Sequence, residues 1–246
     1  MHPKAIFITG TDTGVGKTVL TTLLLAHLRQ SGHPAFALKP FCSGDRADAR
    51  VLHGLQDGDL TLDQVNAFHF REPLAPMVAA RLHGQRIRMN DALRRIRQVS
   101  FVIQNQKSKI KNPLLLIEGA GGLLAPLGEG FNAADLIKKL RCDVIIAAAN
   151  RLGALNHTAL TAGCVSQCAD IQRVAVVLVD VERPSRIKHH ASRTNPEILS
   201  ELLAPIPVFR LPHLPELAKT LGKTERKSLL ITCAKKLKKT LAEILG

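Results

Sequence analysis

The stretch Ile6-Phe7-Ile8-Thr9-Gly10-Thr11-Asp12-Thr13-Gly14-Val15-Gly16-Lys17-Thr18 decides the fold of this chain. An apolar, strand-prone run breaks into a turn of small residues, and a helix-prone segment runs from Val19 to Gln30. A phosphate-binding loop requires this order, because small residues let backbone N–H groups close around phosphate oxygens and the helix presents its positive end. The usual spacing places the first glycine at Thr11, whereas here Gly10 stands one residue earlier.

Two residues at the end of this loop have expected roles. We expect Lys17 to reach the β- and γ-phosphates of a nucleotide and the hydroxyl of Thr18 to hold Mg²⁺. Gly-Lys-Thr alone is common in glycine-rich turns, so the prediction depends on the strand before it and the helix after it. The sequence therefore predicts a nucleotide-binding site at this loop.

The rest of the chain alternates short runs rich in Val, Ile and Leu with helical patterns, which is typical of parallel strands joined by crossover helices. The expected strands are 5–9, 35–39, 114–117, 144–148, 174–179 and 208–211. The expected helices are 17–30, 47–55, 76–83, 90–104, 133–140, 154–168, 196–203 and 228–245, with no strand between 57 and 111. We predict a three-layer, P-loop NTPase-like α/β fold, a mostly parallel central sheet flanked by helices, with residues 1–246 forming one domain.

The composition is that of a globular protein, with 46% hydrophobic and 22% charged residues. No apolar run approaches the ~18 residues of a membrane span, and no charged segment leads into a secretory apolar core. We therefore expect a cytoplasmic protein that binds no membrane. Its five cysteines, an odd number, are expected to be buried thiols rather than a disulfide framework.

The net charge of +14 is the one unusual bulk property. Basic proteins attract nucleic acids, anionic membranes or anionic substrates. The chain has no Trp or Tyr, however, so aromatic platforms for bases are scarce, and its Lys and Arg residues are scattered. We expect a solvated basic surface and small-molecule substrates rather than a nucleic acid.

Two charged residues end predicted strands, where open α/β sheets place their ligands. Lys39 either neutralises the charge of a transferring phosphate or is a surface lysine before a proline turn. Glu118 follows Leu-Leu-Leu-Ile and precedes Gly-Ala-Gly-Gly. A carboxylate at this place supplies the second Mg²⁺ ligand of a P-loop enzyme, and the glycines allow close backbone approach to an anion. Asn156, entering the helix after the next strand, either caps that helix or contacts a ligand.

Together these motifs resemble the dethiobiotin synthetase family of biotin biosynthesis. The matching segments are 9–18, Lys39-Pro40 with Ser43-Gly44, 118–122, and Leu152-Gly153 with Asn156-His157. The early Gly10 is the family's own lengthened loop. The resemblance implies a homodimeric cytoplasmic ligase that uses ATP and Mg²⁺ to join CO₂ to 7,8-diaminononanoate. A substrate amine captures CO₂ as a carbamate, the carbamate attacks the γ-phosphate, and the second amine displaces phosphate from the mixed anhydride.

The resemblance also implies roles for individual residues. Lys39 would be the catalytic residue, bridging carbamate and γ-phosphate. The Mg²⁺ ligands would be Thr18, Asp48 and Glu118, with Asp45 as the alternative to Asp48. The contacts to the diamine would be Thr13, Ser43 and Asn156. The nucleotide would contact Gly14, Val15, Gly16, Lys17, Thr18, Val19, Asp48, Glu118, Gly119, Ala120, Gly121, Pro212, His213 and Leu214.

The chain departs from the family pattern in its C-terminal third. Where the family has an asparagine that reads the adenine edge, this chain has Val179 followed by Asp180, and Phe209 stands at a family glycine. A valine cannot hydrogen-bond a base. We therefore expect broadened nucleotide use.

Two other functions remain open. A partitioning or switch ATPase of the same fold would bind DNA or membrane through its basic face, but such proteins usually carry a lysine early in the loop, where Thr11-Asp12 offers none. An amide-forming ligase of cofactor biosynthesis would usually need a glutaminase domain with catalytic Cys and His, for which the sequence has no room.

Overall fold

The computed structural model describes residues 4–106, 112–168, 171–182, 189–220 and 226–246. Its central sheet has six strands in the order β2-β5-β1-β6-β7-β8, and every neighbouring pair is parallel. The strands are β1 Lys4–Gly10, β2 Ala35–Leu38, β5 Leu114–Glu118, β6 Asp143–Ala149, β7 Val174–Val179 and β8 Val208–Leu211. The parallel α/β fold predicted from the sequence is confirmed.

The central strands are covered on both faces, which explains their nearly continuous apolar sequences. Every residue of β6 is buried, as are the last five residues of β1. In the register of the sheet, Ile8 pairs with Glu118 on one side and Ile145 on the other. Glu118 therefore ends its strand beside the start of the phosphate loop.

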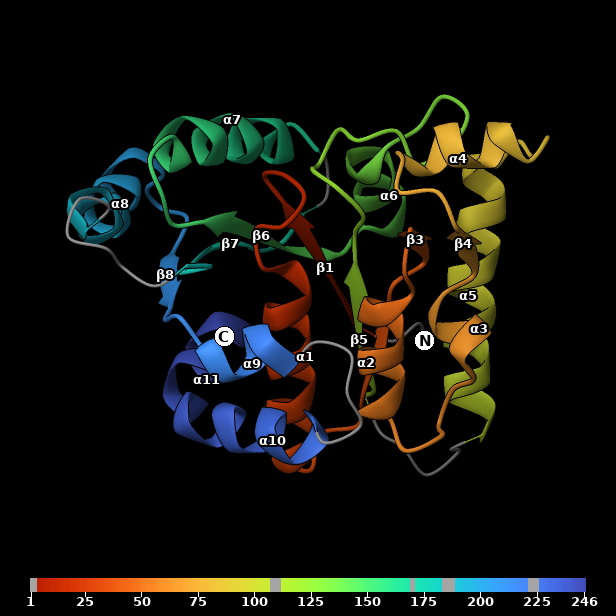
Figure 1. Cartoon of the computed structure of the whole chain (residues 1–246), viewed down its shortest axis with the longest axis horizontal. Helices are drawn as coiled ribbons and strands as arrows, with labels where there is room; N and C mark the ends of the chain where they lie inside the picture. Colours follow the sequence, from red (N-terminus) through yellow and green to blue (C-terminus); the bar gives the residue numbers. More distant parts are fainter. Residues whose placement is uncertain (1–3, 107–111, 169–170, 183–188, 221–225) are drawn as a thin grey trace.

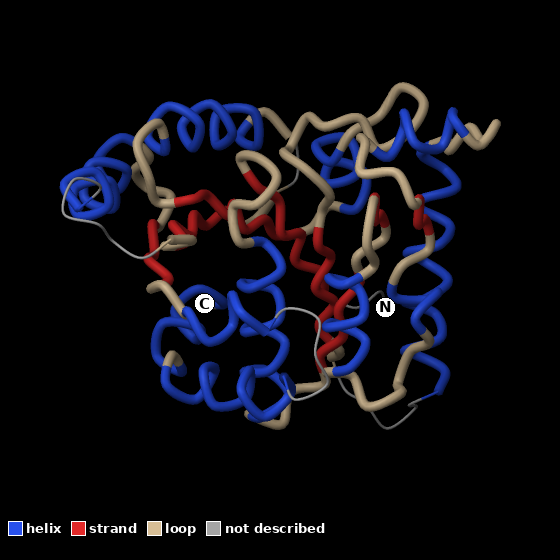
Figure 2. Tube along the Cα trace, in the orientation of Figure 1, coloured by secondary structure: helices blue, strands red, loops and turns tan. Residues whose placement is uncertain are grey.

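Helices cover the sheet in two layers (Figure 1). One layer contains α1 Lys17–Gln30, α10 Arg226–Lys236 and α11 Lys238–Leu245, with α2 Ala47–Gly54 beside α1 and the short α9 Pro215–Thr220. The other contains α6 Ala133–Leu140 and α7 Ala154–Ser166, with α8 His189–Leu202 beside α7 and α5 Met89–Gln106 beside α6. Figure 2 shows the strands lying between these layers, so the predicted three-layer arrangement is confirmed.

A second, two-stranded sheet corrects one prediction. It pairs β3 Phe41–Ser43 with β4 Phe68–Phe70, and α3 Leu62–Val65 and α4 Pro76–Leu82 flank β4 in the chain. The expectation of no strand between residues 57 and 111 was therefore wrong. β4 is only three residues long, too short for a periodic pattern, and Phe41 stacks on Phe68 at 4.9 Å between ring centroids.

Two helix boundaries also differ from the prediction. α8 begins at His189 and holds Pro196 inside it, whereas the sequence placed the helix start at that proline. Proline removes the N–H that would bond the carbonyl of Ser192, and Nδ2 of Asn150 donates to this oxygen instead at 2.9 Å. The helix expected over 228–245 is two helices that meet at Leu237, although Leu230, Cys233, Leu241 and Ile244 are all buried as its apolar stripe predicts.

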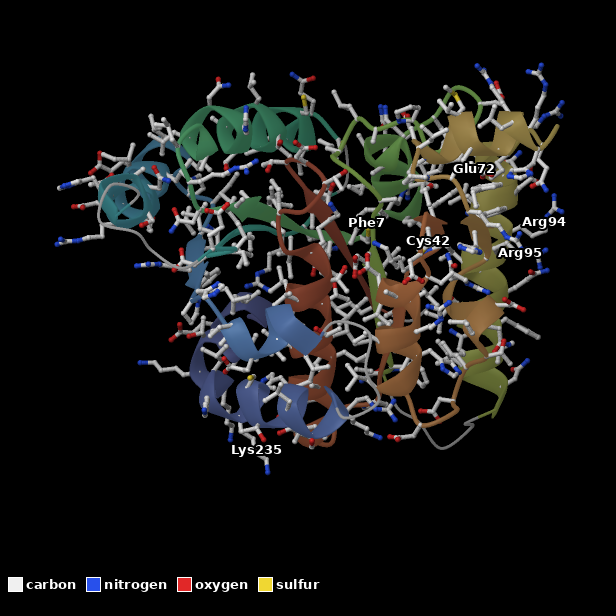
Figure 3. The ribbon with its side chains drawn as sticks, viewed as in Figure 1. Phe7, Cys42, Glu72, Arg94, Arg95 and Lys235 are labelled. Carbon is white, nitrogen blue, oxygen red and sulfur yellow. The ribbon has the colours of Figure 1, made fainter. Side chains whose placement is uncertain are left out.

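The basic side chains are dispersed over the surface. Figure 3 shows Arg94 and Arg95 pointing outward from α5 at one edge of the molecule and Lys235 pointing outward from α10 at another. No helix in the described part of the chain has the length and apolarity to cross a membrane. The five cysteines are free, and burial raises the pKa of Cys142 to about 12.

Candidate active site

A cavity of about 750 Å³ lies over the phosphate loop, at the carboxyl edge of the sheet. Its walls come from the loop between β1 and α1, from β3 and α2, and from the segments after β5, β7 and β8. The predicted site residues that line it are Thr13, Gly14, Gly16, Lys17, Thr18, Val19, Lys39, Ser43, Asp45, Asp48, Glu118, Ala120, Gly121, Pro212, His213 and Leu214.

Three predicted residues lie elsewhere. Val15 is 2% exposed and packs beneath the loop rather than facing the cavity. Gly119 is not among the lining residues; its N–H donates to the carbonyl of Ile8 at 2.9 Å, and its own carbonyl accepts from Nζ of Lys39 at 3.3 Å. Asn156 is exposed on α7 and does not line the cavity of its own chain.

The early Gly10 has a steric reason. A Cβ atom on Gly10 would lie 2.8 Å from Cγ2 of Val15 and 3.1 Å from Nζ of Lys17. Gly14 and Gly16 adopt φ angles of 73° and 94°, which favour glycine. In the lengthened loop Val15 thus packs against the end of β1, and the chain continues directly into α1.

Lys17 links the two loops that enclose the phosphate position. Its Nζ donates to the carbonyl of Asp12 at 2.7 Å and to the carbonyl of Gly121 at 2.6 Å. Burial, and after it the positive charge of Lys39, lowers the pKa of Lys17 to about 8. A bound phosphate would favour the charged form of this amine and raise its pKa.

Lys39, Glu118 and Thr18 form the polar centre of the cavity. Oε1 of Glu118 accepts from Nζ of Lys39 and from Oγ1 of Thr18, each at 2.6 Å. Lys39 is 6% exposed and Glu118 is fully buried. Burial alone would lower the pKa of Lys39, but the negative charges of Glu118 and Asp48 outweigh it and raise that pKa above its usual value.

The carboxylates around this centre differ in whether their oxygens are free to bind a metal ion. Oδ2 of Asp48 lies 3.5 Å from Nζ of Lys39, while Asp45 points to Arg50, with an N···O distance of 2.7 Å. Oε2 of Glu118 is buried and has no hydrogen-bond partner among the described residues. These residues offer three oxygen donors: the hydroxyl of Thr18, the unpartnered oxygen of Glu118 and the carboxylate of Asp48. Such a donor set fits Mg²⁺, which takes its other ligands from water and phosphates.

The part of the cavity lined by β3 and by residues 73–75 has a mixed polar and apolar surface. Oγ of Ser43 is buried without a partner in the described structure. Pro73, Leu74 and Ala75 form an apolar wall of the same cavity, with Leu74 43% exposed. This wall was not predicted from the sequence, although an apolar pair of residues between Pro73 and Pro76 was its visible signal.

The segments after β7 and β8 close the other end of the cavity. Val179 lines it beside the phosphate loop, since a Cβ on Gly16 would lie 2.7 Å from Cγ1 of Val179. Asp180, Val181 and His213 also line this end. Of the departures from the family pattern noted in the sequence, Val179 and Asp180 are therefore part of the cavity wall, whereas Phe209 is not among its lining residues.

Comparisons with known proteins agree with this geometry. A family described as an AAA domain matches residues 4–220. Among solved structures, the MinD cell division protein of Aquifex aeolicus superposes with a TM-score of 0.51 over 95% of this chain and 96% of its own, at 17% identity, a likeness that shows the fold alone.

Curated relatives are much more similar in sequence. The ATP-dependent dethiobiotin synthetase of Bacillus licheniformis is 35% identical over 201 residues, 80% of either chain. That of an Anaeromyxobacter species is 35% identical over 222 residues, 87% of this chain and 92% of its own. That of Bacillus subtilis is 33% identical over 214 residues, 84% of this chain and 85% of its own. The chain therefore belongs to the AAA-domain family and, within it, to the ATP-dependent dethiobiotin synthetases.

Proposed function

We propose that this chain makes dethiobiotin from 7,8-diaminononanoate, CO₂ and ATP, with ADP and phosphate as the other products. One observation carries the proposal: the buried cation of Lys39 lines one cavity together with the phosphate loop and the unpartnered hydroxyl of Ser43. A cation at this junction can contact a transferring phosphate and an anionic acceptor together. The names of the relatives supply the substrate class.

The chemistry needs positioning and charge neutralisation more than acid–base groups. One amine of the diamine attacks CO₂ and loses a proton, which gives a carbamate. A carbamate oxygen attacks the γ-phosphorus while the bond to the ADP oxygen breaks. The second amine then attacks the carbonyl carbon and loses a proton, phosphate leaves with the bonding electrons, and the cyclic urea forms.

Two lysines suit the charge that develops in these steps. Lys17, held over the phosphate loop by the carbonyls of Asp12 and Gly121, would contact the β- and γ-phosphates. Lys39 would bridge the carbamate and the γ-phosphate. Thr18, Asp48 and Glu118 would hold a magnesium ion, which when bound neutralises charge on the phosphate oxygens. Asp48 suits this role better than Asp45, because Asp45 is paired with Arg50.

The diamine would lie on the far side of Lys39. Thr13 and Ser43 offer hydroxyls to its polar end. The apolar wall of Pro73, Leu74 and Ala75 suits an aliphatic chain, whose burial there removes apolar surface from water.

We also propose that the protein acts as a cytoplasmic homodimer, with each chain one domain. Leu124, Leu152 and Leu160 are 60%, 90% and 63% exposed. Leu160 follows Asn156 by one helical turn on α7, so both side chains lie on one face of that helix. Because Asn156 does not line its own cavity, it would contact a substrate bound to the partner copy.

Product formation tests the activity. Purified protein given ATP, Mg²⁺, bicarbonate and the diamine should release phosphate and form dethiobiotin in equal amounts, measured by phosphate assay and mass spectrometry. A rate of phosphate release that does not depend on the diamine but rises with DNA or anionic vesicles would favour the switch ATPase instead.

The dimer has a separate test. Leu160→Asp should yield monomers in light scattering, whereas Leu82→Asp, at 64% exposure on α4, should leave the mass unchanged. Equal masses for both variants and for the wild type would contradict the α7 interface.

A further inference from the structure

The cavity has two ends on opposite sides of the phosphate loop. Glu118 and Lys39 lie on the β5 and β2 side of β1, and Val179, Asp180 and His213 lie on the β7 and β8 side. If the first end takes the γ-phosphate and the acceptor, the nucleoside must extend toward the second. The inference that follows therefore rests on the proposed function for the direction in which the nucleotide lies.

Asp180, the polar residue at the family's base-reading place, bonds to neighbouring side chains through both of its carboxylate oxygens. Its Oδ1 accepts from Nδ2 of Asn150 at 2.7 Å. Its Oδ2 accepts from Nε and Nη2 of Arg210 at 2.9 and 2.7 Å. Asp180 is 6% exposed, and both of its oxygens are bonded to neighbouring side chains, so we assign this carboxylate to holding Asn150 and Arg210 rather than to reading a base. Its neighbours Val179 and Val181 have no polar side-chain atoms.

Among the described residues that line this end of the cavity, His213 is the remaining polar side chain. Its Nδ1 lies 3.1 Å from the backbone carbonyl of Asp180. A carbonyl oxygen only accepts, so Nδ1 must carry the hydrogen, and the neutral ring then holds a lone pair on Nε2. Among the described residues Nε2 has no partner, and the ring lines the cavity. The contact with the carbonyl of Asp180 thus sets the tautomer of the neutral ring, in which Nε2 is the acceptor.

We propose that His213 selects nucleoside triphosphates whose base carries an amino group at the 6-position of a purine or at the 4-position of a pyrimidine. Adenine and cytosine present an N–H donor at the 6- or 4-position, which Nε2 can accept. Guanine, uracil and hypoxanthine present a keto oxygen there, which would face the lone pair of Nε2 and lose its hydrogen bond to water. The loss of the family's asparagine broadens base use from adenine to cytosine but not to keto bases.

Two matched pairs of nucleotides isolate the group that is read. ATP and ITP differ at the 6-position of the purine, and CTP and UTP differ at the 4-position of the pyrimidine. Dissociation constants of the Mg²⁺ complexes are measured by titration calorimetry on the full chain. ATP should bind about tenfold more tightly than ITP, and CTP about tenfold more tightly than UTP, the effect of one unmatched polar group.

Substitutions assign the preference to His213. His213→Phe keeps an aromatic ring without a lone pair, and His213→Gln offers both a donor and an acceptor, so each variant should bring both ratios close to one. His33→Phe makes the same change at an exposed turn and should leave both ratios as in the wild type.

The outcomes separate this inference from the proposed function. Equal affinities within either pair, or ratios that persist in His213→Phe, overturn the role of His213 even when dethiobiotin forms. If both affinity ratios are as expected but no dethiobiotin forms, the role of His213 is upheld and the proposed function is overturned. Protein that binds none of the nucleotides overturns both.

Discussion

Nζ of Lys39 lies 2.6 Å from Oε1 of Glu118, and this same oxygen accepts from Thr18. The contact joins the end of β5 to the residue that follows β2, two neighbouring strands of the sheet. Before nucleotide binds, the lysine therefore compensates a buried carboxylate that we propose as a metal ligand. Arrival of Mg²⁺ and a triphosphate would let Lys39 exchange this carboxylate for the phosphate and carbamate.

Lys39→Met should abolish most turnover while leaving nucleotide binding intact. The lost cation acts on charge that develops during transfer, and removing one such group ordinarily costs about 10²–10³-fold in rate. Lys4→Met removes a lysine whose side chain is 66% exposed and pairs with Asp143, so it serves as the control. Steady-state rates and calorimetric titration with ATP measure the two effects. Turnover of Lys39→Met at the wild-type rate would refute the catalytic role.

The Lys39–Glu118 pair should also contribute to the free energy of unfolding of the nucleotide-free protein. Lys39→Met leaves the fully buried Glu118 without its partner and should lower the free energy of unfolding by about 3–5 kcal/mol. Adding Glu118→Gln removes the stranded charge, so the double variant should recover part of that loss while staying inactive. Urea unfolding of the single and double variants measures the coupling. Strictly additive losses would mean that the two side chains do not interact.

The main lines of this site could be predicted because the motifs occur at strand ends. Parallel strands bring their carboxyl ends to one edge, so Thr18, Lys39 and Glu118 had to lie near one another once the strands were located. The sequence does not say, however, that β2 and β5 are neighbours, and the direct contact of Lys39 with Glu118 depends on that pairing. Local sequence patterns also do not show where a tertiary contact lets a helix continue through a proline. Pro196 lies inside α8, and Asn150 supplies the hydrogen bond that the proline cannot donate.

Nucleotide affinity should fall as the pH rises above the pKa of Lys17. In the free protein that pKa is about 8, lowered first by burial and then by Lys39. A bound triphosphate favours the charged amine and raises the pKa, so the complex holds more protons than the free protein above about pH 8. Binding should therefore take up a proton between about pH 8 and pH 9, which calorimetry in buffers of different ionisation enthalpy detects. Lys17→Arg keeps its charge throughout and should lose this pH dependence; the same slope in both proteins would contradict the assignment.

Gly10→Ala should damage the phosphate loop, because the added Cβ would lie 2.8 Å from Cγ2 of Val15. Overpacking of this kind costs about 1–3 kcal/mol, and the displaced loop should bind ATP more weakly. Gly54→Ala, with nothing within 4 Å of its added Cβ at the end of α2, should leave both stability and binding unchanged or slightly improved. Val15→Ala removes the methyl that Gly10→Ala would meet, so the double variant should regain ATP affinity relative to Gly10→Ala alone. Calorimetric titration and urea unfolding measure these changes. A double variant that binds no better than Gly10→Ala would show that the early glycine is needed for a reason other than its contact with Val15.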